Sequence, residues 1–186
     1  AKYFIAGGTD LYVQKPDELL EQEIIFIKNK KLSYIKVDGN ICSVGAATTF
    51  EMINDYPVFQ NHFPRLKNYF DLIASLPIRN SATVGGNIIN ASPIGDLTIF
   101  FLALNASAVL NNGVKKRKIL LKDFYKGYKQ LNKTCDEYLE CIEFILPSKN
   151  IHFNFEKVSK RTHLDIASVN SAMCIETDND IISSVH

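Results

Sequence analysis

The sequence lacks the residue clusters that would indicate a metal site. Its four cysteines, Cys42, Cys135, Cys141 and Cys174, are widely scattered, with no Cys-x-x-Cys pair and no histidine at ligand spacing. Metal and iron–sulfur sites need clustered thiolates or imidazoles, so we predict that the side chains of this chain bind no metal. We interpret the cysteines as free thiols in a reducing compartment.

Long apolar runs and an excess of one charge are also absent. No run approaches the roughly 20 apolar residues that a membrane-spanning helix needs. The 21 Lys and Arg residues nearly balance the 20 Asp and Glu residues, and the formal net charge is +1. This balance makes nucleic acid and membrane surfaces unexpected partners. The sequence begins AKYFIAGG, without the pattern of a targeting peptide, so we expect a cytoplasmic protein.

The composition that is present is typical of a globular protein. Hydrophobic residues make up 46% of the 186 residues and charged residues 22%, which is enough apolar material for a substantial core. This length favours one large domain, or one domain and part of a second. We place the boundary at the linker-like residues 147–150, with a first domain at 1–147 and the start of a second at 150–186.

One stretch organises the chain, residues 78–97, which read IRNSATVGGNIINASPIGDL. Gly85 and Gly86 follow the β-branched pair Thr83 and Val84, and a polar cluster precedes an apolar run. This pattern predicts a strand that stops, a turn that exposes backbone N–H groups, and a helix that begins at residues 92–96. Because glycine has no Cβ, such a turn can lie directly against a ligand, most commonly a phosphate or pyrophosphate.

A second glycine turn, AGGTDL, occupies residues 6–11 after a short predicted strand at residues 3–5. It is not a P-loop, since no Gly-Lys-Ser/Thr follows, and it is not the Gly-x-Gly-x-x-Gly of a dinucleotide-binding fold. Alone, it would be a plain tight turn. Two such turns in one chain suggest that they meet in space and hold a single dinucleotide pyrophosphate between them.

Hydrophobic periodicity predicts the remaining elements. We expect a polar turn or short helix at residues 16–20. A short helix should begin at Thr48 or Thr49, pack Phe50, Met52 and Ile53 inward and end at Pro57, and an amphipathic helix should cover residues 58–76. The expected strands are a fully buried one at 24–27, a hairpin of 32–37 and 41–46, a hairpin of 108–110 and 119–121, an edge-like strand at 136–147, strands at 152–160 and 165–174, and a last one from 181 after a turn at 177–180.

A basic run follows the central helix. It is interpreted as a solvated face, with docking of an acidic redox partner or of phosphate groups left open. Its members are Lys115, Lys116, Arg117, Lys118, Lys122, Lys126, Lys129 and Lys133.

Several motifs in order resemble one protein family. The motifs are residues 5–11 (IAGGTDL), 78–88 (IRNSATVGGNI), 91–97 (ASPIGDL), 155–161 (FEKVSKR) and 165–167 (DIA). Together they are similar to the FAD-binding subunit or domain of the xanthine dehydrogenase and carbon monoxide dehydrogenase family of molybdenum hydroxylases. The resemblance implies an α+β FAD-binding fold of the vanillyl-alcohol oxidase (PCMH) type with two subdomains. The start of a C-terminal α+β domain like that of carbon monoxide dehydrogenase flavoproteins follows. The family also has one more strand and helix before the first motif, and a longer C-terminal domain.

The resemblance also implies which residues bind FAD. Main-chain N–H groups of Ile5, Ala6, Gly7, Gly8, Thr9, Asp10, Leu11 and Tyr12 are expected to wrap the pyrophosphate, and Thr83, Val84, Gly85, Gly86 and Asn87 to approach it from the other subdomain. The hydroxyls of Thr9 and Thr83 can donate to phosphate oxygens. With the phosphate approached through bare backbone, we expect Gly85→Val to abolish FAD retention and leave the fold largely intact.

Further positions are implied around the flavin ring and the sugar. Asp96 would repel a pyrophosphate, so we assign it to a sugar or ribityl hydroxyl, or to amides of its own loop. The main chain of Leu139 corresponds to a position that meets the ring, and Ala74, with Ile73, ends the helix that packs against it. Lys157 corresponds to a lysine near the pyrimidine end, where a cation raises the flavin potential. No catalytic residue is expected, because the flavin carries the chemistry.

The implied function is electron transfer. FAD would accept electrons from two-iron two-sulfur clusters on an iron–sulfur subunit, fed by a molybdopterin cofactor on a molybdenum subunit, and pass them to NAD or another acceptor. One alternative is a non-catalytic scaffold or assembly subunit that keeps the fold and has lost flavin. Another is an unrelated nucleotide-phosphate enzyme, which would need a metal-binding acidic pair, with Asp10 and Asp96 as the candidates.

Overall fold

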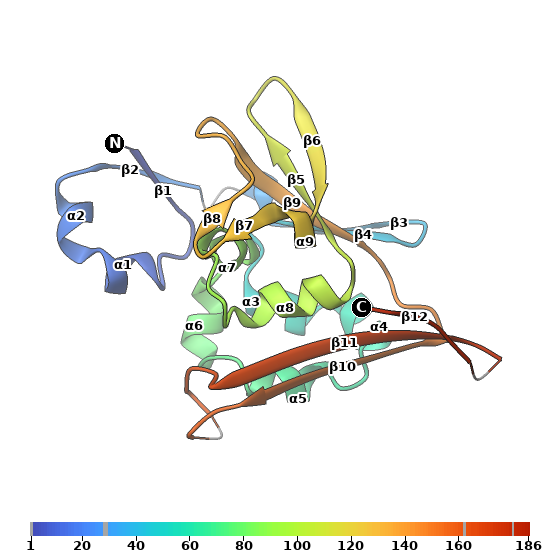
Figure 1. Ribbon diagram of the computed structural model, residues 1–186. Coiled ribbons are helices and arrows are strands. Elements are labelled where there is room, and N and C mark those ends of the chain that lie inside the picture. Colours follow the sequence, from blue (N-terminus) through green and yellow to red (C-terminus); the bar gives the residue numbers. More distant parts are fainter. Residues whose placement is uncertain (1, 28–29, 162, 180) are drawn as a thin grey trace.

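A five-stranded antiparallel sheet forms one layer of the computed structural model, which describes residues 2–27, 30–161, 163–179 and 181–186 (Figure 1). Both predicted hairpins in it are confirmed. The strands lie in the order β3 (Ile35–Asp38), β4 (Ile41–Gly45), β9 (Tyr138–Ile145), β5 (Ser107–Asn111) and β6 (Lys116–Leu120).

The prediction of β9 as an edge strand was wrong. It lies in the middle of the sheet, paired with β4 on one side and β5 on the other. The polar side chains in its alternating pattern have partners on neighbouring strands: Glu140 accepts from Asn111 at 2.7 Å, and Glu143 pairs with Lys118 at 2.9 Å. Cross-strand pairs of this kind let a central strand keep charged residues.

A second sheet closes the other side of the molecule. It contains β10 (Ile151–Val158), β11 (Val169–Asp178) and β12 (Ile181–Val185), all antiparallel. Helix α7 (Val84–Asn90) contacts β4 and β9, and α8 (Asp96–Ala103) contacts β11, so these two helices lie between the sheets (Figure 1). The predicted turn at 177–180 includes Asp180, which lies outside the described residues.

Aromatic side chains join the two layers in one core. The rings of Phe63, Phe100 and Phe153 lie 4.7 to 5.2 Å apart, centroid to centroid, in all three pairings. Phe63 follows α4 (Pro57–His62), Phe100 is on α8 and Phe153 is on β10. The C-terminal sheet therefore shares its packing with the rest of the chain, and the domain boundary at 147–150 stays a prediction.

The helix predicted over residues 58–76 is broken into pieces. Its apolar positions are buried as expected, but the backbone forms α4, α5 (Leu66–Asp71) and α6 (Leu76–Ser81). Pro64 cannot donate a helical hydrogen bond, and Ala74 has a left-handed φ of 50°. These two residues interrupt a pattern that the spacing of apolar residues alone describes as continuous.

The central glycine stretch is helical rather than a strand and a turn. Thr83 is the N-cap of α7, and its Oγ1 accepts from the Gly86 N–H at 3.1 Å, so both glycines lie in the first turn of a helix. The following helix, α8, begins at Asp96 as predicted. Upstream, α3 (Phe50–Asn54) is capped by Thr49 as expected, but Met52 is exposed and Pro57 begins α4 instead of ending α3.

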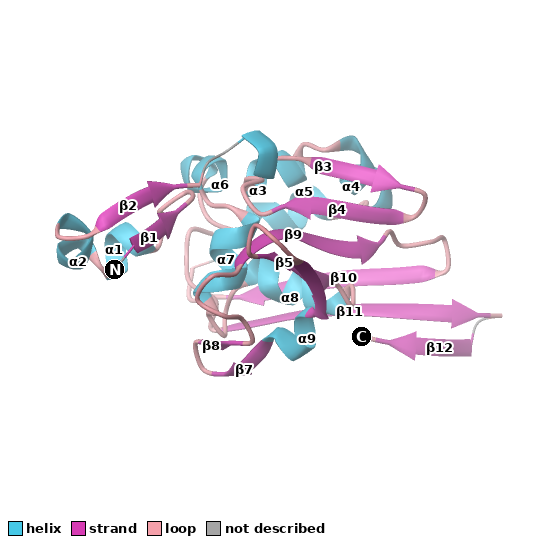
Figure 2. Cartoon of the chain, turned by 90° about the horizontal axis from the view of Figure 1, so that it is seen from above, coloured by secondary structure: helices cyan, strands magenta, loops and turns pink. Residues whose placement is uncertain are grey.

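The N-terminal residues form a small lobe to one side of the sheets (Figure 2). Its strands β1 (Lys2–Ile5) and β2 (Glu23–Phe26) are parallel, joined by α1 (Leu11–Gln14) and α2 (Pro16–Leu20). The expectation of a fully buried second strand was wrong, because a two-stranded sheet leaves Phe26 66% exposed. The remaining elements are η1 (Lys30–Leu32), α9 (Leu121–Phe124), β7 (Tyr125–Gly127) and β8 (Gln130–Leu131).

No helix in the described part of the chain is long and apolar enough to cross a membrane.

Phe155→Ala should destabilise the whole protein, because Phe155 on β10 is fully buried and its ring lies 5.7 Å from that of Tyr69 on α5. The cavity should cost about 3–5 kcal/mol of unfolding free energy. Urea unfolding followed by far-ultraviolet circular dichroism should show one cooperative transition at a lower midpoint. The exposed Val158→Ala on the same strand is the control and should change little. A separate early transition of the C-terminal sheet alone would contradict the shared core.

Candidate functional site

The two glycine motifs lie side by side, as the sequence predicted. Gly7 is packed against the end of α6: a Cβ built on it would lie 1.9 Å from the carbonyl oxygen of Ser81. The Asn90 Nδ2 of α7 also donates to the Asp10 Oδ2 at 3.0 Å. Only glycine fits at position 7, and its contact brings the first turn against the residues that lead into Thr83.

The first turn presents unpaired backbone donors. None of the N–H groups of residues 6–11 has a hydrogen-bond acceptor among the described residues. Gly8 has a φ of 70°, and the carbonyl oxygen of Gly8 accepts from the Tyr12 N–H at 3.1 Å, which closes the turn. Left-handed residues in such turns create backbone concavities that bind anions. The geometry therefore fits a phosphate or pyrophosphate.

The helical part of the second motif, residues 84–87, has no such free donors, which corrects our expectation for these residues. The N–H groups at the start of α7 are all used within the protein. Val84 donates to the Thr48 carbonyl at 3.0 Å, Gly85 to the Ala46 carbonyl at 2.8 Å, Gly86 to Thr83 Oγ1, and Asn87 to the Thr83 carbonyl at 3.0 Å. A helix N-terminus whose orphan donors are already satisfied offers little to an anion.

Gly85 serves packing instead of ligand approach. A Cβ built on it would lie 2.8 Å from both the Cβ and the carbonyl oxygen of Ala46, so α7 can rest on the end of β4 only without a side chain there. The expectation that Gly85→Val leaves the fold intact is therefore wrong. Gly86 is different, because its Cβ would meet only Thr83 Oγ1, at 3.1 Å.

Asn87 connects the second and third motifs. Its Oδ1 accepts from both the backbone N–H of Thr98, at 3.0 Å, and the Thr98 hydroxyl, at 3.1 Å. Thr98 lies in the first turn of α8, whose N-cap, Gly95, has no capping side chain. Asn87 thus supplies from another helix the cap that α8 lacks.

Asp96 and Lys157, predicted at different parts of a flavin, are direct partners here. The Lys157 Nζ lies 2.8 Å from the Asp96 Oδ2, and the two side chains are only 5% and 13% exposed. Asn170 on β11 completes the cluster, since its Nδ2 donates to the Asp96 Oδ1 at 3.1 Å. Buried charges require such pairing. Asn170 was missed from the sequence because no local motif marks it.

Ala74 and Leu139 occupy different surroundings. Leu139 is buried within β9 opposite Leu110, and its side chain belongs to the core. The Ala74 carbonyl accepts from the Arg79 Nη1 at 3.0 Å, and the same Nη1 reaches the carbonyls of Phe70 and Ile73. Arg79 also pairs with Glu51, so it holds the turn before α6. Arg79 stood in a recognised motif, but the sequence assigned it no role.

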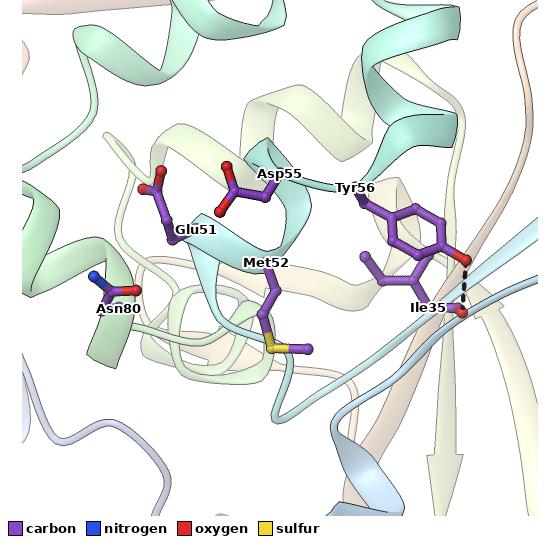
Figure 3. A pocket seen from close by; sticks show the side chains of 6 residues that line it. All are labelled: Ile35, Glu51, Met52, Asp55, Tyr56 and Asn80. Carbon is purple, nitrogen blue, oxygen red and sulfur yellow. Dashed lines mark hydrogen bonds between the residues drawn. The ribbon is translucent and has the colours of Figure 1, made fainter.

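Two hollows on the surface are lined by other residues than those predicted to bind the cofactor. One, of about 300 Å³, is lined by Ile35, Glu51, Met52, Asp55, Tyr56 and Asn80 (Figure 3), and the other, of about 450 Å³, lies beside His62 and residues 145–148. None of the predicted cofactor-binding residues lines either hollow. The unpaired donors of the first turn, rather than a deep cavity, therefore define the candidate site.

The remaining reactive groups do not suggest another chemistry. Burial raises the pKa of Cys42 to about 12 and that of Cys141 to about 11, which keeps these thiols protonated. Within the described ranges, no group of three or more His, Cys, Asp or Glu side chains could hold a metal ion. The middle of the basic run forms surface ion pairs: Lys116 with Glu140, Arg117 with Glu137, and Lys118 with Glu143.

Comparison with solved structures identifies the fold. The chain superposes on carbon monoxide dehydrogenase from Hydrogenophaga pseudoflava with a TM-score of 0.90 and 24% identity, covering 99% of this chain and 64% of that one. It also superposes on quinoline 2-oxidoreductase from Pseudomonas putida 86, with a TM-score of 0.87 and 23% identity over 99% of this chain and 64% of that one. The predicted α+β fold class is thereby confirmed.

Sequence comparison identifies the family. Residues 1–148 match the family described as FAD binding domain in molybdopterin dehydrogenase, and the chain belongs to this family. It is 31% identical to the nicotinate dehydrogenase FAD-subunit of Eubacterium barkeri, over 94% of this chain and 61% of that protein. It is 28% identical to the xanthine dehydrogenase FAD-binding subunit of Escherichia coli O157:H7, over 97% and 63%. The chain thus spans about three fifths of these relatives, and membership confirms the predicted family and FAD as its cofactor.

Gly85→Ala should destabilise the protein by about 1–3 kcal/mol, because the added methyl group overlaps Ala46 at the junction of α7 and β4. Gly86→Ala, one residue further on in the same helix, is the matched control. It should change the unfolding free energy much less, since the gain in helix propensity offsets a tight contact with Thr83. Urea unfolding of the two variants tests this difference, and equal stabilities would contradict it.

Lys157→Met should cost about 3–5 kcal/mol of unfolding free energy, because it leaves the Asp96 carboxylate buried with only Asn170 as a partner. The double variant Lys157→Met with Asp96→Leu removes both charges and should recover much of the loss. A double-mutant cycle measured by urea unfolding gives the coupling between the two. Additive effects would show that the pair does not act as a unit.

Proposed function

We propose that the protein is the FAD-binding, electron-transfer subunit of a xanthine dehydrogenase-like molybdenum hydroxylase in the cytoplasm. One observation carries this proposal: a turn rich in unpaired backbone donors, residues 6–11, lies against the segment that leads into the second family motif. Bound FAD supplies the redox chemistry by taking up electrons and passing them on. Family membership and the names of the relatives support the assignment.

Different residues of the chain would bind different parts of FAD. Within residues 5–12, the N–H groups of residues 6–11 and the Thr9 hydroxyl would hold the pyrophosphate, and Ile5 and Tyr12 would frame the turn, since the Tyr12 N–H is bonded to the Gly8 carbonyl. The second motif would contribute chiefly by holding α7 and α8 in place beside that turn, through Thr83, Val84, Gly85, Gly86 and Asn87. The positions nearest the FAD sugar and the flavin ring would be Ala74, Asp96, Leu139 and Lys157. No side chain of the protein need act as an acid or base.

The partners would be an iron–sulfur subunit and a molybdenum-cofactor subunit of the same complex, with NAD or another acceptor taking the electrons. The named relatives are subunits of dehydrogenases, which supports this arrangement. Within the chain, we propose residues 1–147 as the FAD-binding domain and 150–186 as the start of the flavoprotein C-terminal domain.

A second candidate is a scaffold subunit that has lost flavin. The observation that favours it is that many motif residues are satisfied within the protein: the α7 amides are bonded, and Asp96 and Lys157 pair with each other. The colour of the purified protein distinguishes a flavin-binding subunit from a scaffold subunit. Full-length protein purified with its complex should be yellow and contain one FAD per chain, whereas protein that stays colourless after incubation with FAD would favour the scaffold.

Gly8→Ala should weaken FAD binding by about tenfold or more in the full-length protein. An added Cβ would lie 2.4 Å from the Tyr12 ring and would disfavour the φ of 70°, so the turn and its N–H groups would be displaced. Gly113→Ala is the matched control. Gly113 also has a positive φ, of 87°, but lies at an exposed hairpin with no neighbour within 4 Å. Equal FAD titration curves for the two variants would remove residues 6–11 from the site.

A further inference from the structure

Asp96 lies at the junction of three elements. It is the first residue of α8, it follows the loop of the third family motif, and it faces the β10–β11 hairpin. Lys157 on β10 and Asn170 on β11 are directly opposite each other in the antiparallel register. Directly opposed residues project from the same face of a sheet about 5 Å apart. Both side chains therefore reach the same carboxylate.

Each oxygen of that carboxylate has its own donor. The Oδ2 takes the Lys157 ammonium at 2.8 Å and the Oδ1 takes the Asn170 amide at 3.1 Å. The Asn170 Nδ2 also donates to the Ile94 carbonyl at 3.2 Å, so both of its hydrogens are used. Asn170 thus binds the side chain of Asp96 and the backbone of the loop that precedes it.

We infer that Asn170 is a positioning residue of the flavin site. The inference rests on the proposed function, because Asp96 and Lys157 are the proposed contacts to the sugar and the ring. Without Asn170 the carboxylate has a single donor and can rotate, and the ammonium that follows it is held less firmly. Asn170 lies on β11, beyond residue 148, where the match to the FAD-binding family ends. The C-terminal sheet would therefore help to shape the site of the preceding domain.

A purely structural Asn170 would behave differently from a positioning one. Loss of its hydrogen bonds should lower stability in either case, since a hydrogen bond to a buried charge contributes to folding. Only a positioning residue should also alter the bound flavin. The reduction potential of FAD and its affinity are therefore the informative measurements, and activity is not needed to read them.

The experiment uses full-length protein with FAD. Asn170→Ala should bind FAD about tenfold more weakly and should shift the flavin midpoint potential to lower values, because the Lys157 cation is less firmly placed. Asn170→Asp, which puts a carboxylate beside Asp96, should have the larger effect on both. Asn170→Ser keeps one donor and should lie between Asn170→Ala and wild type. Ser171→Ala, on the neighbouring exposed residue of β11, is the control and should match wild type.

The outcomes separate this inference from the function on which it rests. Wild-type protein that binds no FAD would overturn the proposed function, and the inference with it. Wild-type protein that binds FAD, with unchanged affinity and potential in Asn170→Ala, would overturn the inference alone, whatever happens to stability. If Asn170→Ala does not fold, the flavin midpoint potentials of Asn170→Ser and Ser171→Ala are compared instead. Equal potentials in these two variants would overturn the inference.

Discussion

The close approach of Gly7 to the Ser81 carbonyl is the constraint on which the site depends. With no side chain at position 7, the turn after β1 can lie against the end of α6. The hydrogen bond between Asn90 and Asp10 holds the far side of the same contact. Through these two contacts the N-terminal lobe, which has only a two-stranded sheet of its own, gains a fixed position beside α7 (Figure 2).

The two glycine motifs have different physical roles despite their similar composition. In the first, a left-handed Gly8 gives a turn in which the N–H groups of residues 6–11 have no acceptor in the part of the chain that the structure describes. In the second, Gly85 and Gly86 lie in a helix whose first N–H groups are all bonded, and Gly85 allows α7 to pack on β4. One motif is thus suited to binding an anion and the other to holding the binding surface in place.

A buried polar cluster ties the second sheet to the same region. The aromatic rings of Phe63, Phe100 and Phe153 pack β10 against α8, with only a modest preference for particular ring orientations. The Asp96–Lys157 ion pair with Asn170 adds direction, because charged and amide groups tolerate few arrangements when they are buried. A buried ion pair is seldom the most stable way to fill a core, so its presence beside the third motif is consistent with a role in the site.

Elements with strong local signals could be predicted from the amino-acid sequence alone. Asp38-Gly39-Asn40 and Asn111-Asn112-Gly113 marked their hairpins, and Thr49 and the region of Asp96 marked helix starts. The family motifs, read in order, also determined the family and the fold class. These features depend on residues close together in the chain, where propensity and turn chemistry act directly.

The remaining features depend on contacts between distant parts of the chain. The tertiary structure placed β9 in the centre of its sheet, made the second glycine pair helical, and joined Asp96 to Lys157 and to Asn170, which is 74 residues away. It also decided which glycine motif keeps free donors, because the acceptors of the Val84 and Gly85 amides are the carbonyls of Thr48 and Ala46 on another part of the chain, whereas those of Gly86 and Asn87 belong to the neighbouring Thr83. Long-range partners of this kind leave no local pattern, since hydrogen bonding and packing between distant segments depend on the folded arrangement and not on neighbours in sequence.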